Sequence, residues 1–154
     1  MKYLPESLAE ALALRHGHAF LPLFFSKDNA TEDCIVLVQL PEIDLIFEDH
    51  GHYIFGLNLS LSSLKEYLDG RDQTLANQLL PITNLAGTLS VLGEILTTNN
   101  LPGNVCQCLS GCEASLKTYD GSSGRNLTFR TGGDSFQISD LEPHELPMLI
   151  LIPK

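Results

Sequence analysis

The hydrophobic period changes twice along this chain, and these changes constrain what it can fold into. Residues 34–59 form short apolar segments separated by turn residues, a pattern typical of strands. From Ser60 to about residue 97, leucines recur mainly at the three- and four-residue spacings of a helix. Alternation returns near residue 105. The sequence therefore predicts strands, then helices, then strands.

Segregated runs of strands and helices predict an α+β fold with a mainly antiparallel sheet. We expect strands at about 18–59 and 105–152, and two or three helices between them at about 61–97. The second run should hold strands near 112–119, 125–131 and 136–138 and an apolar last strand at 148–152. A helix precedes the first run, with Pro5 at its first position and Gly17 just after its end. Because no long linker interrupts the chain, residues 1–154 are expected to form a single globular domain.

The first run of strands contains one clear hairpin. Residues 34–40 are almost continuously apolar, which predicts a strand that is buried on both faces or covered by a helix. The next two strands are expected at 43–47 and 52–59, joined by the acidic turn Glu48-Asp49-His50-Gly51. Residues 82–97 are ambiguous, because the leucine spacing favours a helix whereas Gly87 and Gly93 oppose one; we expect a helix there.

Charge and hydropathy exclude several classes of function. The chain of 154 residues carries a net charge of −10, which repels phosphate backbones and argues against direct nucleic-acid binding. No apolar run approaches the roughly 18 residues of a membrane span, and the N-terminus lacks the pattern of a signal peptide. We therefore expect a cytoplasmic protein without a membrane partner. Many cytoplasmic proteins are acidic, so the charge need not have a specific role.

Carboxylates are concentrated where basic residues are missing. Between Lys27 and Lys65 the chain has seven Asp and Glu residues and no Lys or Arg. They flank or follow the strands expected there, where they could prevent edge-to-edge aggregation or form a docking face for a basic protein. The residues predicted to contact such a partner are Asp44, Glu48, Asp49, Glu42 and Asp33.

Histidines and cysteines offer two alternative metal sites. Two His-Gly-His units supply His16, His18, His50 and His52, and imidazole is a normal zinc ligand. Each glycine also marks the end of an expected element, so the histidines could simply lie at element ends. The second set is Cys106, Cys108 and Cys112. If residues 106–108 form a strand, two thiols face one side and could bind a soft metal or form a redox-active bridge. Reduced thiols that pack as small apolar residues are the simpler interpretation.

Catalytic motifs are absent. The chain has no G-x-S-x-G, G-x-G-x-x-G or Walker sequence, and the glycine-serine segment 120–125 fits a hairpin turn. His144 lies between Glu142 and Glu145 and could act as a general acid, although a solvated loop before the last strand explains this segment better.

The sequence thus predicts a small acidic cytoplasmic binding protein, such as an adaptor, chaperone or inhibitor of the immunity type. It would capture a basic protein partner through an acidic sheet face, and no cofactor is expected. The alternative is a small metal-binding or thiol-dependent enzyme that uses the His-Gly-His units or the cysteine cluster. The sequence leaves a homodimer open.

Overall fold

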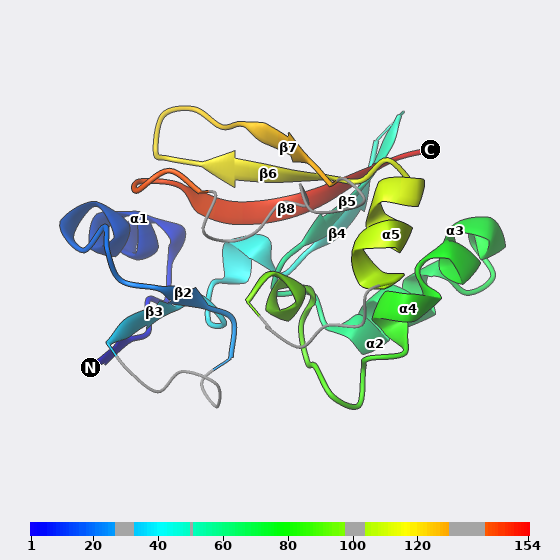
Figure 1. The fold of residues 1–154 in the computed structure, drawn as a ribbon, viewed down its shortest axis with the longest axis horizontal. Helices are drawn as coiled ribbons and strands as arrows, with labels where there is room; N and C mark the ends of the chain where they lie inside the picture. The colour runs from blue at the N-terminus through cyan, green and yellow to red at the C-terminus, as the bar shows by residue number, and fades with distance from the viewer. Residues whose placement is uncertain (27–32, 50, 98–103, 130–140) are drawn as a thin grey trace.

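The computed structural model describes residues 1–26, 33–49, 51–97, 104–129 and 141–154. Two β-sheets and a group of short helices make up these ranges (Figure 1). The elements in chain order are β1 (Lys2–Tyr3), α1 (Leu8–Gly17), β2 (Leu23–Phe24), β3 (Cys34–Val36), the 3-10 helix η1 (Pro41–Ile43), β4 (Ile46–Glu48), β5 (His52–Gly56), α2 (Leu61–Leu68), α3 (Gln73–Gln78), α4 (Leu80–Thr83), the 3-10 helix η2 (Leu92–Leu96), α5 (Asn104–Gly111), β6 (Ser115–Tyr119), β7 (Asn126–Thr128) and β8 (Leu146–Pro153). The predicted α+β class is confirmed.

The larger sheet is antiparallel and has the strand order β4-β5-β8-β6-β7. The last strand of the chain, β8, lies at its centre, where it pairs with β5 on one side and β6 on the other. Tyr53 and Phe55 of β5 are buried, whereas Ile54 between them is only partly buried. This alternation is expected of a strand with one face on the core. The predicted hairpin is confirmed, because β4 and β5 pair across residues 49–51.

The smaller sheet has three parallel strands in the order β1-β3-β2. Its middle strand β3 is completely buried, as the apolar run predicts. The expectation of a mainly antiparallel sheet misses this parallel arrangement. Its cause is α1, which connects β1 to β2 and returns the chain in the same direction along the sheet, as a helical crossover does.

The two sheets share one hydrophobic core. Ile35 of the small sheet and Phe55 of the large sheet belong to the same cluster of buried side chains. Asn58, just after β5, is also buried, and its Nδ2 donates to the carbonyl oxygens of Leu37 at 2.7 Å and Leu40 at 3.1 Å. These hydrogen bonds fix the turn that follows β3 against the end of β5.

Helix α1 begins later than predicted. Ser7 is its N-cap, and the Ser7 hydroxyl accepts a hydrogen bond from the amide of Glu10 at 3.2 Å. Serine satisfies a free amide of the first turn, which proline cannot do, so Ser7 rather than Pro5 sets the start.

The helical run is confirmed only in its first part. Ser60 caps α2, accepting a hydrogen bond from the amide of Ser63 at 3.1 Å. The helix expected over residues 82–97 is wrong beyond Thr83: Val91 forms a bridge with Ser60, and only 3-10 helix η2 follows. Gly93 in η2 packs directly against the ring of Phe25, and only glycine fits there, because a Cβ atom would lie 2.5 Å from that ring. The leucine spacing was therefore misleading.

The second run of strands begins later than residue 105, because Asn104–Gly111 forms α5. The expected strands near 112–119 and 125–131 are present as the shorter β6 and β7, and the apolar C-terminal strand as β8. The strand expected at 136–138 lies outside the described residues. Among the described helices, none combines the length and the apolar character needed to cross a membrane.

Candidate interaction surface

The five carboxylates predicted to bind a partner lie in different parts of the fold. Asp33 directly precedes β3 and forms an ion pair with the N-terminal amine of Met1. Glu42 lies in η1, and its Oε2 accepts a hydrogen bond from the amide of Leu8 at 2.8 Å, in the first turn of α1. A carboxylate is favourable there because free amides point out of the start of a helix. Asp33 and Glu42 thus also hold local structure.

Asp49 shapes the hairpin tip. Its Oδ1 accepts hydrogen bonds from the amides of Gly51 at 3.0 Å and His52 at 2.8 Å. These two bonds hold the pKa of Asp49 below its usual value, because they favour the charged form. The side chain remains half exposed, so it can still face a partner.

Glu48 is held between a helix and the C-terminus. Its carboxylate accepts a hydrogen bond from the hydroxyl of Tyr67 in α2 at 2.5 Å, and it forms an ion pair with the Lys154 ammonium at 3.3 Å. The Tyr67 hydrogen bond is the main reason why the pKa of Glu48 is lowered, and the bond to Lys154 adds to it. Replacing Glu48 would therefore disturb the packing of β4 on α2 as well as the surface.

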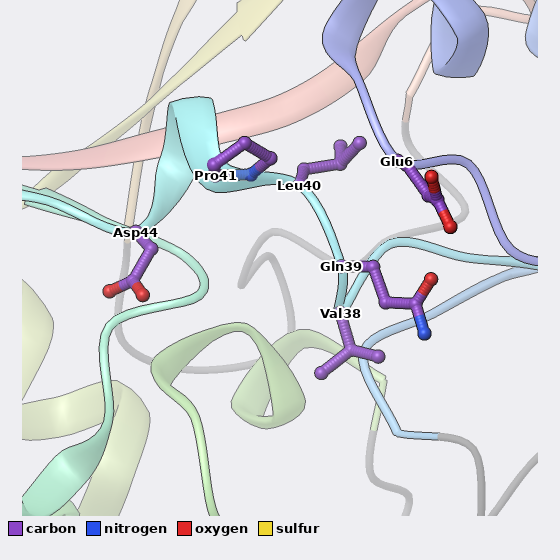
Figure 2. A pocket seen from close by; sticks show the side chains of 6 residues that line it. All are labelled: Glu6, Val38, Gln39, Leu40, Pro41 and Asp44. Atoms are coloured by element: carbon purple, nitrogen blue, oxygen red, sulfur yellow. The ribbon is translucent and has the colours of Figure 1, made fainter.

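Asp44 differs from the other four. It follows η1 and is exposed, and no hydrogen bond or ion pair to its side chain occurs among the described residues. It lines an open surface cleft of about 460 Å³ together with Glu6 and the segment 38–41. Figure 2 shows Glu6 and Asp44 on opposite sides of this segment. This cleft places two exposed carboxylates where a partner can reach them.

The histidines do not form a metal site among the described residues. His16 stacks on His144 with ring centroids 4.9 Å apart, and its Nε2 lies 3.1 Å from the carbonyl oxygen of Asp120. His18 stacks instead on Tyr3. His52 lies at the hairpin tip beside Asp49, and His50 is outside the described residues. Within the described ranges, no group of three or more His, Cys, Asp or Glu side chains could hold a metal ion.

Two cysteines of the cluster lie on a helix instead of the expected strand, and Cys112 lies in the turn just after that helix. Cys106 and Cys108 are in α5, where positions two apart point in different directions, so the shared strand face is wrong. The side chain of Cys106 is outside the described residues. Cys108 donates to the carbonyl of Val105 at 3.1 Å, and Cys112 to that of Leu109 at 3.4 Å. Burial raises the pKa of the Cys112 thiol, which makes it less reactive.

The sequence did not predict that Glu145 would be a buried, multiply bonded carboxylate. Glu145 is only 5% exposed, although the segment 142–145 was expected to be a solvated loop. Its carboxylate accepts hydrogen bonds from Thr118 at 2.6 Å, from Arg125 Nε at 2.8 Å and from the amide of Glu142 at 2.8 Å. The bonds from Arg125 contribute most to lowering the pKa of Glu145 to about 2. Glu142 and His144 themselves are exposed, as expected.

Arg15 joins helix α1 to the same segment. Its guanidinium is buried and donates to the backbone oxygens of Glu145 at 3.0 Å and Glu142 at 3.3 Å, and to those of Ala19 at 3.4 Å and Leu21 at 3.3 Å. Burial lowers the pKa of Arg15, partly offset by the nearby charge of Glu145. Arg15 lies in the last turn of α1, and the sequence contains no signal that it would be buried.

Comparison with known proteins shows the fold alone. No protein-family model and no curated protein sequence matches the chain. Solved structures do match over 99% of its length: the cyanide-inactivated Cu,Mo-CO dehydrogenase (21% identity, TM-score 0.71), the reconstituted CO dehydrogenase of Oligotropha carboxidovorans (17%, 0.75) and quinoline 2-oxidoreductase of Pseudomonas putida 86 (14%, 0.69). The chain spans 58% of the length of those chains.

Proposed function

We propose that this chain is a domain of an oxidoreductase assembly and has a role other than substrate recognition. The observation that carries the proposal is the match of nearly the whole chain, 99%, to chains of CO dehydrogenases and of a quinoline oxidoreductase. Carbon monoxide and quinoline differ greatly in size and shape. A fold common to enzymes for both is better suited to a task that those enzymes share than to binding either substrate.

The chemistry of the described residues is consistent with such a role. The carboxylate with the largest pKa shift, Glu145, is used to join strands and loops and does not line the cleft beside Asp44. The name of one matched enzyme, the Cu,Mo-CO dehydrogenase, includes copper and molybdenum. Because the described residues gather no set of three metal ligands, we assign the holding of such metals to other parts of the assembly.

Purification from the organism that encodes the chain tests this proposal. We expect a chromosomally tagged copy to co-purify in fixed ratio with other subunits, and the complex to show a visible absorption spectrum and bound metal. Deletion of the gene should reduce the amount of that complex. Isolation of the chain as a single 16.9 kDa species, with no complex altered by the deletion, would contradict the proposal.

A second candidate function is the capture of a basic protein partner. The observation in its favour is the cleft in which Glu6 and Asp44 are exposed, in a chain with a net charge of −10. Neither side chain has a hydrogen-bond or ion-pair partner among the described residues. An exposed carboxylate without an internal partner attracts a basic surface without first losing a bond of its own.

The substitution Asp44→Lys tests partner capture. Once a partner is available from the co-purification, we expect this variant to bind it more slowly and to lose most of the salt dependence of association. Asp69→Lys is the matched control, because Asp69 is also exposed and lies at the end of α2. Wild-type association rates for Asp44→Lys at low salt would exclude this candidate.

A further inference from the structure

Strand β4 forms one edge of the five-stranded sheet. Its pairing with β5 fixes which backbone groups face outward. The carbonyl of Leu45 accepts from the amide of Gly56 at 2.9 Å, and the amide of Asp49 donates to the carbonyl of His52 at 3.0 Å. Because hydrogen-bonding direction alternates along an antiparallel strand, the N–H and C=O groups of Ile46 and Glu48 point away from the sheet. Within the described ranges these outward groups have no backbone partner.

An aromatic side chain lies on this edge. Phe47 is 56% exposed, which is unusual for a large apolar residue on an edge strand. On the same face of the sheet it has Ile54 of β5 as its cross-strand neighbour, and Leu151 of β8 is the neighbour of Ile54. Ile54 and Leu151 are partly buried. A side chain added beyond β4 would therefore extend an existing apolar row and cover Phe47.

Carboxylates lie at both ends of the edge strand. Asp44 precedes β4, and Glu48 and Asp49 end it. Asp49 follows Asp44 by five positions, which spans about 17 Å in an extended chain. Lys154 pairs with Glu48 and neutralises part of this charge, and its charge also acts on Asp49, whereas neither Asp44 nor Asp49 forms an ion pair with a Lys or Arg among the described residues. A strand carrying basic residues near its ends therefore fits the edge better than a second copy of this acidic chain.

We propose that the edge of β4 docks an extended basic segment of a partner polypeptide, which adds to the sheet as a further antiparallel strand. The segment has an apolar residue opposite Phe47 and Lys or Arg toward each end. Backbone hydrogen bonds to Ile46 and Glu48 supply the attachment, and side-chain contacts supply the selectivity. This inference rests on the proposed capture of a basic partner and specifies how capture occurs.

A synthetic peptide tests the docking directly. The probe is acetylated and amidated Lys-Lys-Thr-Val-Thr-Lys-Lys, whose central valine would lie opposite Phe47. We measure the NMR shifts of the protein amides during titration with the peptide, and the hydrogen-exchange rates of these amides with and without it. The peptide should slow exchange at the outward amides of Ile46 and Glu48, while the amide of Phe47, which already faces β5, changes little. The same peptide with Glu in place of Lys should not bind.

Two variants and a matched control make the result specific. Phe47→Lys removes the apolar contact and adds a repelling charge, and Ile46→Pro removes one outward donor without breaking a bond to β5. Each should weaken peptide binding about tenfold or more. Phe20→Lys is the control, because Phe20 is fully exposed and lies outside both sheets. It should bind the peptide as the wild type does.

Three outcomes would overturn the strand-docking proposal. One is an unchanged exchange rate at Ile46 and Glu48 with peptide present at millimolar concentration. Another is protection of these amides that depends on protein concentration alone, which would assign the edge to a second copy of the chain. The third is a partner whose binding is weakened by Asp44→Lys and unaffected by Phe47→Lys and Ile46→Pro. In that case charge-driven capture stands and strand addition does not.

Discussion

Glu145 and Asp49 are carboxylates in two regions that the sequence describes in the same way, as polar segments beside a strand. The structure separates them. Glu145 is buried before β8 and is bound by Thr118 and Arg125, whereas Asp49 is half exposed and interacts with the backbone and the His52 side chain of its own turn. The environment of a carboxylate, more than its presence in a charged run, decides whether it stabilises the fold or remains available to a partner.

The two regions are also held together by contacts of different range along the chain. The Glu145 region connects α1, β6 and the loop before β8 through Arg15, Thr118 and Arg125, which are distant in sequence. The tip of the β4–β5 hairpin is closed by neighbours in the chain. Breaking a contact of a buried charged group costs more unfolding free energy than breaking an exposed local contact. The buried group that loses its partner cannot bind water instead.

Acid should weaken the Glu145 region. The pKa of Glu145 is lowered from 4.5 to about 2 in the folded chain, so its stabilising contribution is complete above pH 4.5 and is lost as the pH falls toward 2. The shift corresponds to about 3 kcal/mol of unfolding free energy. Urea unfolding between pH 7 and pH 2 measures it, with Glu145→Gln as the reference in which this contribution is missing. A constant difference between the two proteins across that range would contradict the assignment.

At neutral pH, Glu145→Gln itself should lower the free energy of unfolding by about 2–3 kcal/mol, because Arg125 loses its charged partner and a neutral amide replaces the carboxylate that Thr118 and the Glu142 amide bind. Glu142→Gln provides the control, because that side chain is exposed and three positions away. Denaturation midpoints of the two variants should differ clearly. Equal midpoints would show that burial of Glu145 contributes nothing.

Arg15→Lys should have a smaller effect, a loss of about 1–2 kcal/mol of unfolding free energy. A lysine ammonium cannot reach four carbonyl oxygens arranged around a planar guanidinium, so at least one buried acceptor loses its donor. Arg71→Lys is the matched control, because Arg71 is exposed and its side chain donates to one carbonyl, that of Tyr67. Thermal unfolding by circular dichroism compares them. A wild-type transition for Arg15→Lys would mean that water replaces the lost bonds.

Asp49→Ala should have the smallest effect on stability, because the turn it closes is exposed and local. We expect faster hydrogen exchange at the amides of Gly51 and His52, which lose their acceptor, with β5 and β8 unchanged. Asp120→Ala is a parallel case, since Asp120 accepts from the amides of Ser122 and Ser123 in the same manner. A global loss of stability as large as that of Glu145→Gln would remove the distinction between the two regions.

The period of the hydrophobic residues predicted the elements well where one face of an element meets the core. The β4–β5 hairpin, helix α2 and strand β8 are of this kind. The prediction failed at residues 84–97, where leucines at helical spacing lie in turns and in η2. The spacing of leucines indicates which residues are buried. It predicts a helix only where the backbone between those leucines can adopt a helical conformation. Here the bridge between Ser60 and Val91 and the contact of Gly93 with Phe25 override it.

The candidate site was predictable in part. The hairpin and its carboxylates follow from alternation and turn residues. The separate tasks of Asp33, Glu42, Glu48 and Asp49 could not be foreseen, because each depends on a donor that is distant in sequence or on the exact turn geometry. The same is true of the exposed edge at Phe47, which exists because β8 and not another strand pairs with the far side of β5.

The sequence by itself determined the fold class, the negative charge and the position of the acidic hairpin, because these depend on local spacing and composition. Only the tertiary structure decided that β1, β2 and β3 run parallel, that Arg15 and Glu145 are buried, and that Asp44 and the β4 edge remain accessible. The physical reason is that burial and strand pairing are properties of contacts between distant segments. A charged residue can be solvated by water or paired inside the protein. The neighbours that the fold places around it determine which of these two environments it has.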